Sequence, residues 1–143
     1  MEFEGKFCYL EPFSTVNTVV KAKFETSEIS DVFDETLSKN LSKKRLAILK
    51  EAGGAPVVVR GQVVSIDEGN QWLRYFLTFL AGKTVFEVEG EVLVNGAKVA
   101  DLHAVKKRGI GVFGGSSKGL LITNTKAAAK SVASQIVSAI KKS

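Results

Sequence analysis

The feature that most constrains the fold is a stretch of strict alternation between residues 84 and 94. Side chains of a β-strand point to opposite faces in turn, so this alternation predicts a strand with one buried and one solvated face. Asn95-Gly96 follows at once, and this dipeptide tolerates the positive φ angles of a two-residue hairpin turn. We therefore expect residues 97–108 to pair back antiparallel onto 84–94. The predicted buried face holds Phe86, Val88, Val92 and Val94, and the opposite face holds Glu87, Glu89 and Glu91.

Apolar patterns elsewhere predict two further strands and two helices. Residues 5–13 are aromatic and apolar and predict a first strand, and residues 57–66 are rich in valine and predict a central one. Gly61 within the central strand indicates a bulge or a close backbone approach. The helices are expected to follow caps at Thr26 or Ser27 and at Asn124. Their apolar stripes are Ile29, Val32, Phe33, Leu37 and Leu41 in the first helix, and Ala129, Val132, Ala133, Ile136, Val137 and Ile140 in the second.

Three segments leave alternatives open. Residues 17–24 fit a loop or an edge strand, and residues 43–50 fit either an extension of the first helix or a short strand, because periodicity does not decide on so few residues. Residues 72–80 are unusually aromatic without a clean amphipathic period. Burial is the favoured interpretation for that segment, and an exposed partner surface is the alternative.

Together these elements predict an α+β fold. We expect a single mixed or antiparallel β-sheet of about four to five strands with two main helices packed on one face. The expected order is β-α-β-(aromatic segment)-β-β-α. The length of 143 residues fits a single domain, 1–143, and neither a repeat nor a linker interrupts it.

Segments that would indicate a membrane anchor or export are not found in the sequence. No apolar run reaches the about 18 residues of a transmembrane helix. The first residues include Glu2 and Glu4, unlike the basic and apolar start of a secretory signal. The expected location is periplasmic or envelope-associated if a signal peptide was removed, and cytoplasmic otherwise.

The residues that carry chemistry predict no catalytic centre. Residues 109–114 match the pattern G-x-G-x-x-G of a dinucleotide loop, but residues 116–119 are expected to continue the loop where a helix should begin. No acidic residue follows Asp101 to hold a ribose. His103 is the one histidine and Cys8 the one cysteine, so a catalytic triad has no second imidazole to draw on and a His- or Cys-rich zinc site has too few members. We expect no catalytic residue, no metal ligand and no cofactor, and a packing role for Cys8.

The three glutamates of residues 84–94 are compatible with cation binding but are explained more simply by a solvated sheet face. Lys98 or Lys106 is expected to pair with them across the ladder. His103 is expected on the solvated face of its strand, beside Asp101.

Positive charge is spread along the chain, with a net charge of +5. Two basic triplets occur, and neither alternates with the aromatic residues on which nucleic-acid modules stack bases. Nucleic acid is therefore not a favoured partner, although a basic surface for nucleic acid or anionic lipid remains the alternative function. The candidate basic patch consists of Lys43, Lys44, Arg45, Lys106, Lys107 and Arg108.

From about Pro56 onward the sequence resembles a bacterial family called domain of unknown function 4410 (DUF4410), many of whose members are exported or lipid-anchored. The resemblance implies a strand-helix-strand-hairpin-helix order and is nearly silent on activity. The residues that carry it are 57–63, Glu68-Gly69, Arg74, Ala81-Gly82-Lys83, the hairpin around Asn95–Val99 and the glycine-rich stretch 109–115.

These patterns and the resemblance predict a non-enzymatic binding or structural module of the bacterial cell envelope. We expect it to act through contacts with a protein partner or with a second copy of itself, and no small-molecule ligand is identified. The candidate interface lies in the aromatic segment, since Trp, Tyr and Arg dominate energetic hot spots. It consists of Trp72, Arg74, Tyr75 and Phe79.

Overall fold

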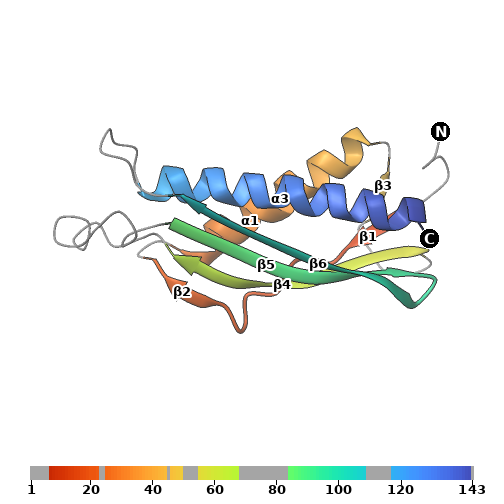
Figure 1. The fold of residues 1–143 in the computed structure, drawn as a ribbon, viewed down its shortest axis with the longest axis horizontal. Helices are drawn as coiled ribbons and strands as arrows, with labels where there is room; N and C mark the ends of the chain where they lie inside the picture. The colour runs from red at the N-terminus through yellow and green to blue at the C-terminus, as the bar shows by residue number, and fades with distance from the viewer. Residues whose placement is uncertain are drawn as a thin grey trace.

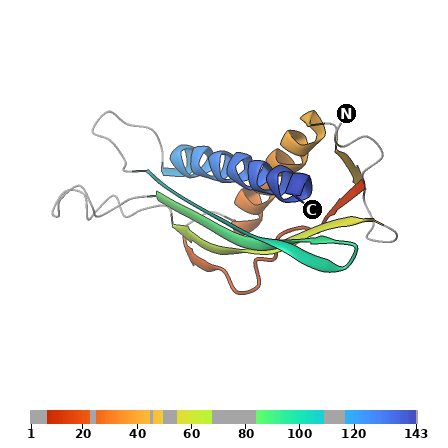
Figure 2. The ribbon, with the colours of Figure 1, turned by 45° about the vertical axis from the view of Figure 1, so that its right-hand side comes forward.

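A six-stranded sheet and two helices on one of its faces make up the part of the chain that the computed structural model describes (Figures 1 and 2). This part comprises residues 7–22, 25–44, 46–49, 55–67, 84–108 and 117–142. The α+β class and the helices on one face are as predicted. The elements are β1 (Phe7–Leu10), β2 (Val19–Lys21), α1 (Thr26–Lys43), β3 (Ala47–Leu49), β4 (Val57–Asp67), β5 (Thr84–Val94), β6 (Ala97–Arg108) and α3 (Ser117–Lys142).

The sheet is mixed and has the strand order β3-β1-β4-β5-β6, with β2 also paired to β4. The predicted four to five strands and their order are wrong in detail, because β2 and β3 are separate strands. Each has three residues, which is too short for alternation to reveal. The first two of the three open segments are thereby settled. Residues 17–24 contain the edge strand β2, and residues 43–50 contain the end of α1 followed by β3.

The hairpin of β5 and β6 is confirmed in register and in turn chemistry. The two strands pair antiparallel from Thr84↔Arg108 to Val94↔Ala97, with one irregularity between Val92 and Leu93. Asn95 and Gly96 have φ angles of 51° and 84°, as a two-residue turn of this kind requires.

Both helices bury the stripes that their spacing predicts, with Val32 and Val137 only partly covered. Ile29, Phe33, Leu37 and Leu41 of α1 are at most 1% exposed, and α3 adds Leu121 and Ala128 to its predicted stripe. Aromatic rings join the elements of the core. The ring centroid of Phe33 lies 4.8 Å from that of Phe13 and 5.5 Å from that of Phe86. The helices therefore cover the inner face of β4 and β5, where Val59 and Val88 are fully buried.

The predicted helix caps are wrong. The residue before α1 is Glu25, and no side-chain cap bond forms there, so Thr26 and Ser27 lie in the first turn. α3 begins at Ser117, so residues 117–119 of the expected loop already belong to the helix. Asn124 therefore lies inside the helix and not before it. Asn124 is 1% exposed, and its Nδ2 donates to the backbone oxygen of Thr84 at 3.2 Å and to its Oγ1 at 2.8 Å. Asn124 was expected to cap the helix; its side chain instead forms buried hydrogen bonds that connect α3 to β5.

The outer edge of β6 is partly closed by a side chain of α3. The backbone N–H of His103 donates to Oε1 of Gln135 at 3.1 Å, and Nε2 of Gln135 donates to the backbone oxygen of His103 at 2.8 Å. The amide thus makes the two bonds that another strand would make there. This contact fixes α3 against β6 and protects part of an edge strand.

Gly61 and Gly90 stand opposite each other in the pairing of β4 and β5. A Cβ on Gly61 would lie 2.7 Å from Cε2 of Phe13, and a Cβ on Gly90 would lie 2.5 Å from the backbone oxygen of Arg60. The predicted close approach at Gly61 is confirmed, whereas the bulge in β4 lies between Val63 and Ser65. The missing side chain of Gly61 leaves space for the Phe13 ring.

We predict that Gly61→Ala destabilises the protein by about 1 to 3 kcal/mol or more, because the new methyl group meets backbone and the Phe13 ring. Urea unfolding followed by circular dichroism measures the change. Gly96→Ala is the matched control: its Cβ meets nothing within 4 Å, so it should lose only the about 1 to 2 kcal/mol that a positive φ costs. A Gly61→Ala variant as stable as the wild type would contradict this close packing.

Candidate functional site: the outer face of the sheet

The face of the sheet opposite the helices carries two rows of polar side chains. Alternation along β4, β5 and β6 sends these side chains outward, while their neighbours in sequence enter the core. A row without outward side chains separates the two polar rows. The polar rows are Arg60–Glu91–Asp101 and Gln62–Glu89–His103, and the row between them is Gly61–Gly90–Leu102.

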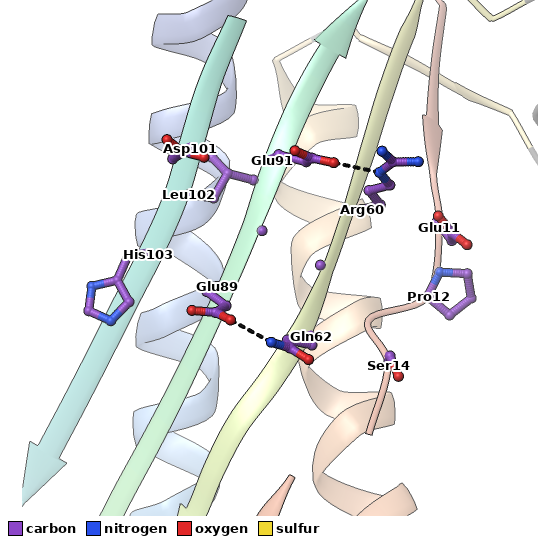
Figure 3. Close-up of a pocket in the computed structure, with 12 residues that line it drawn as sticks. Glu11, Pro12, Ser14, Arg60, Gln62, Glu89, Glu91, Asp101, Leu102 and His103 are labelled. Carbon is purple, nitrogen blue, oxygen red and sulfur yellow. Dashed lines mark hydrogen bonds and ion pairs between the residues drawn. The ribbon is translucent and has the colours of Figure 1, made fainter. Parts of the chain in front are cut away.

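Each glutamate of β5 has a partner, but the partners differ from those predicted. Nε of Arg60 donates to Oε1 of Glu91 at 2.7 Å, and the amide of Gln62 donates to Glu89 (Figure 3). Lys98 lies instead 3.0 Å from Asp101, and Lys106 stands opposite Phe86 and therefore points to the other face. Among the described residues, neither lysine forms an ion pair with these glutamates, although the charge of Glu91 adds to the rise in the pKa of Lys98 that Asp101 causes.

His103 lies on the outer face, as predicted, and its Nε2 is 2.7 Å from Oε2 of Glu87. Its imidazole side chain is 56% exposed. On the same strand, Lys98 interacts with Asp101, and this contact raises the pKa of Lys98 above its usual value. These contacts order the side chains of the face without burying them.

Between the two polar rows lies a hollow of about 670 Å³. Its floor is the row Gly61–Gly90–Leu102, and one wall comes from Glu11, Pro12 and Ser14 between β1 and β2 (Figure 3). The lining is predominantly acidic. Four carboxylates, of Glu11, Glu89, Glu91 and Asp101, stand against the single guanidinium of Arg60 and the imidazole of His103.

Among the described residues, no group of three or more His, Cys, Asp or Glu side chains is placed to hold a metal ion. Cys8 is fully buried, as predicted, and burial raises the pKa of its thiol to about 12, so the nucleophilic thiolate does not form at neutral pH. Within the described residues, no helix combines the length and apolar character needed to cross a membrane.

A second cavity of about 330 Å³ lies on the other side of Pro12, between β1, β3 and α1. The carboxyl group of Asp34 lines it and accepts the backbone N–H of Phe13 at 3.3 Å. Burial raises the pKa of Asp34 from its usual 3.8 to about 6, and the charge of Asp31 adds to this rise, while the Phe13 bond opposes it. No sequence pattern singles out Asp34, because it adjoins an ordinary apolar stripe.

We predict that Asp34 makes the wild-type protein lose stability as the pH rises. The folded state holds the Asp34 proton more tightly than the unfolded state does, so this contribution is full below about pH 4 and is lost as the pH passes about 6. Asp34→Asn keeps an acceptor for Phe13 and removes the titration. Urea unfolding between pH 4 and pH 7 should show stability falling more for the wild type than for Asp34→Asn; parallel curves would contradict this.

The sequence-predicted interface and most of the dinucleotide-like loop lie outside the described residues. This applies to Trp72, Arg74, Tyr75 and Phe79, to residues 109–114 and to Arg45, and the role of that interface stays a prediction. Lys43 and Lys44 end α1 next to β3, whereas Lys106 and Lys107 lie near the end of β6 that pairs with Thr84. The structure therefore places the described lysines of the two triplets at opposite ends of the sheet (Figure 1).

Arg60 and Gln62 are functional candidates that sequence reasoning missed. Their signal is present in the sequence: Arg60 and Gln62 alternate with Val59, Gly61 and Val63. What the sequence lacks is the register that places these polar residues opposite the glutamates.

The model of the family described as Domain of unknown function (DUF4410) matches residues 17–118. The chain belongs to this family. The match begins earlier than the expected start near Pro56, taking in β2 and α1, and it ends at the beginning of α3. No match was found among curated protein sequences.

Several solved structures share the fold of this DUF4410 chain. The hypothetical protein CT253 from Chlamydia trachomatis aligns with a TM-score of 0.57 at 12% identity, over 96% of each chain. Protein XCC0632 from Xanthomonas campestris gives 0.58 at 9% identity, over 92% of this chain and 81% of its own. Lipoprotein GNA1162 from Neisseria meningitidis gives 0.52 at 12% identity, over 93% of this chain and 99% of its own. Identities this low show a common fold alone.

Proposed function

We propose that this protein is a non-enzymatic accessory module of the bacterial envelope that binds a protein partner through the outer face of its sheet. The observation that carries the proposal is the hollow between the two polar rows. The described helices cover the opposite face, so the hollow is open to a partner (Figure 2). The residues of the β1–β2 connection give this hollow a wall that an open sheet face by itself does not have.

The charge of this face favours a partner with a basic surface. The four carboxylates around the hollow contrast with the net charge of +5 of the whole chain. Complementary charge raises association rates and excludes partners of like charge. A second copy of the chain is one source of such a surface, because α3 has five lysines and no acidic residue.

An envelope location is supported by fold and family. Lipoprotein GNA1162 of Neisseria meningitidis has the same fold over nearly its whole length. Small accessory domains act through contacts with other molecules. In the described part of the chain, polar surface side chains pair with one another, and no nucleophilic side chain lies beside a base.

The proposal predicts that reversing one charge in the hollow weakens binding of a basic peptide. The probe is a fluorescein-labelled, unstructured peptide of lysine, arginine and glycine, measured by fluorescence anisotropy at low and high salt. Glu89→Lys should weaken binding about tenfold or more, since like charges at an interface cost several kcal/mol. The matched control is Glu35→Lys, an exposed glutamate on α1, which should change the affinity less than about twofold.

Two results would contradict the proposal. One is equal affinity of Glu89→Lys and the wild type for the peptide. The other is failure to bind the peptide together with salt-sensitive binding to DNA or to anionic vesicles, which would favour the basic-surface function instead. Sedimentation of the wild type and Glu89→Lys tests the second copy as the partner: loss of a wild-type oligomer in the variant would identify it.

A further inference from the structure

The cavity beside Asp34 lies beyond Pro12 from the outer face and combines the carboxyl groups of Asp34 and Glu11 with mostly apolar walls. β1 and the residues after it contribute Tyr9, Leu10 and Pro12, and the remaining apolar wall comes from Leu37, Ile48 and Leu49. We propose that this cavity binds a small organic cation: an ammonium or guanidinium group carried on an apolar body. The proposal is independent of the function proposed for the outer face.

The first step concerns charge. Asp34 is half-buried, and among the described residues no lysine, arginine or histidine forms an ion pair with it. Its one hydrogen bond from the described backbone, the 3.3 Å bond from Phe13, is long. A partly buried carboxylate with so little compensation gains from a charged donor, and a bound cation supplies one.

The second step concerns the groups that face Asp34. Asp31 lies on the same helix, and Glu11 lines the cavity from the end of β1, so both nearby charges are negative. Tyr9 and Ser38 are the neutral polar side chains in the lining. This potential repels anions and attracts cations. Among the described residues, no group of three or more acidic, histidine or cysteine side chains is placed to supply the several ligands that Ca²⁺ or Mg²⁺ requires.

The third step concerns size and origin. A volume of about 330 Å³ is at the lower end of the range for small-molecule sites and fits a group about the size of one large side chain. Beside the cavity, Glu11 and Ser14 donate their backbone N–H groups to Val59 and Gly61 of β4, whereas Pro12 has no N–H and Phe13 turns into the core. That turn directs the Phe13 N–H to Asp34 instead of to β4.

Binding of a cation requires the carboxylate form of Asp34. With a pKa of about 6, Asp34 is mostly ionised at pH 7.5 and mostly protonated at pH 5. The affinity should therefore fall about tenfold between these two pH values.

The test is a chemical-shift titration of the ¹⁵N-labelled full chain with benzylamine, and with benzyl alcohol as its neutral isostere. Benzylamine should shift the amides of Phe13, Ser38 and Ile48 at pH 7.5, and benzyl alcohol should bind about tenfold more weakly or not at all. Asp34→Asn should lose the difference between the two probes. Glu35→Gln, an exposed carboxylate one residue away, should keep it.

Equal binding of both probes to the wild type would overturn the proposal, and so would an unchanged preference for benzylamine in a folded Asp34→Asn. If benzylamine shifted only amides of the outer face, the cation site beside Asp34 would be overturned, and the function proposed for the outer face would be unaffected. A second arm compares short peptides that contain lysine or norleucine at one position. Selective binding of the lysine peptide at this cavity identifies a protein side chain as the source of the cation, and benzylamine binding without peptide binding identifies a free amine.

Discussion

The close approach of β4 and β5 at Gly61 and Gly90 is the constraint on which the rest of the structure depends. Neither position has room for a side chain, and the Phe13 ring packs on the inner side of Gly61. Phe13 then contacts Phe33, which contacts Phe86, so one aromatic column joins the β1–β2 connection, α1 and β5. Because Phe13 is held in the core, Pro12 and Glu11 stand at the surface between two hollows.

This constraint separates the two faces of the sheet. The inner face carries the buried valines and phenylalanines that stabilise the fold, and the exposed ion pairs of the outer face add little, because solvent screens them. Outer residues such as Glu89 are therefore free to change without unfolding the protein.

Local patterns predicted the parts of the fold that local physics determines. The β5–β6 hairpin follows from alternation and Asn95-Gly96, and both helix stripes follow from apolar spacing. The short strands β2 and β3 stayed open alternatives because three residues carry no period, and they form by pairing with β4 and β1. The site was predicted only in part: the glutamate face was expected, but Arg60 and Gln62 depend on a register between strands that the sequence does not state. The Asp34 cavity depends on the path at Pro12, which is set by tertiary packing.

The most direct test of this account is the position of the Phe13 ring in solution. Proton NMR of the full chain should show nuclear Overhauser contacts between the Phe13 ring and the α-protons of Gly61, together with ring-current shifts of these protons. Absence of these contacts, with Gly61 α-protons at ordinary strand shifts, would contradict the packing that separates the two faces and forms both hollows.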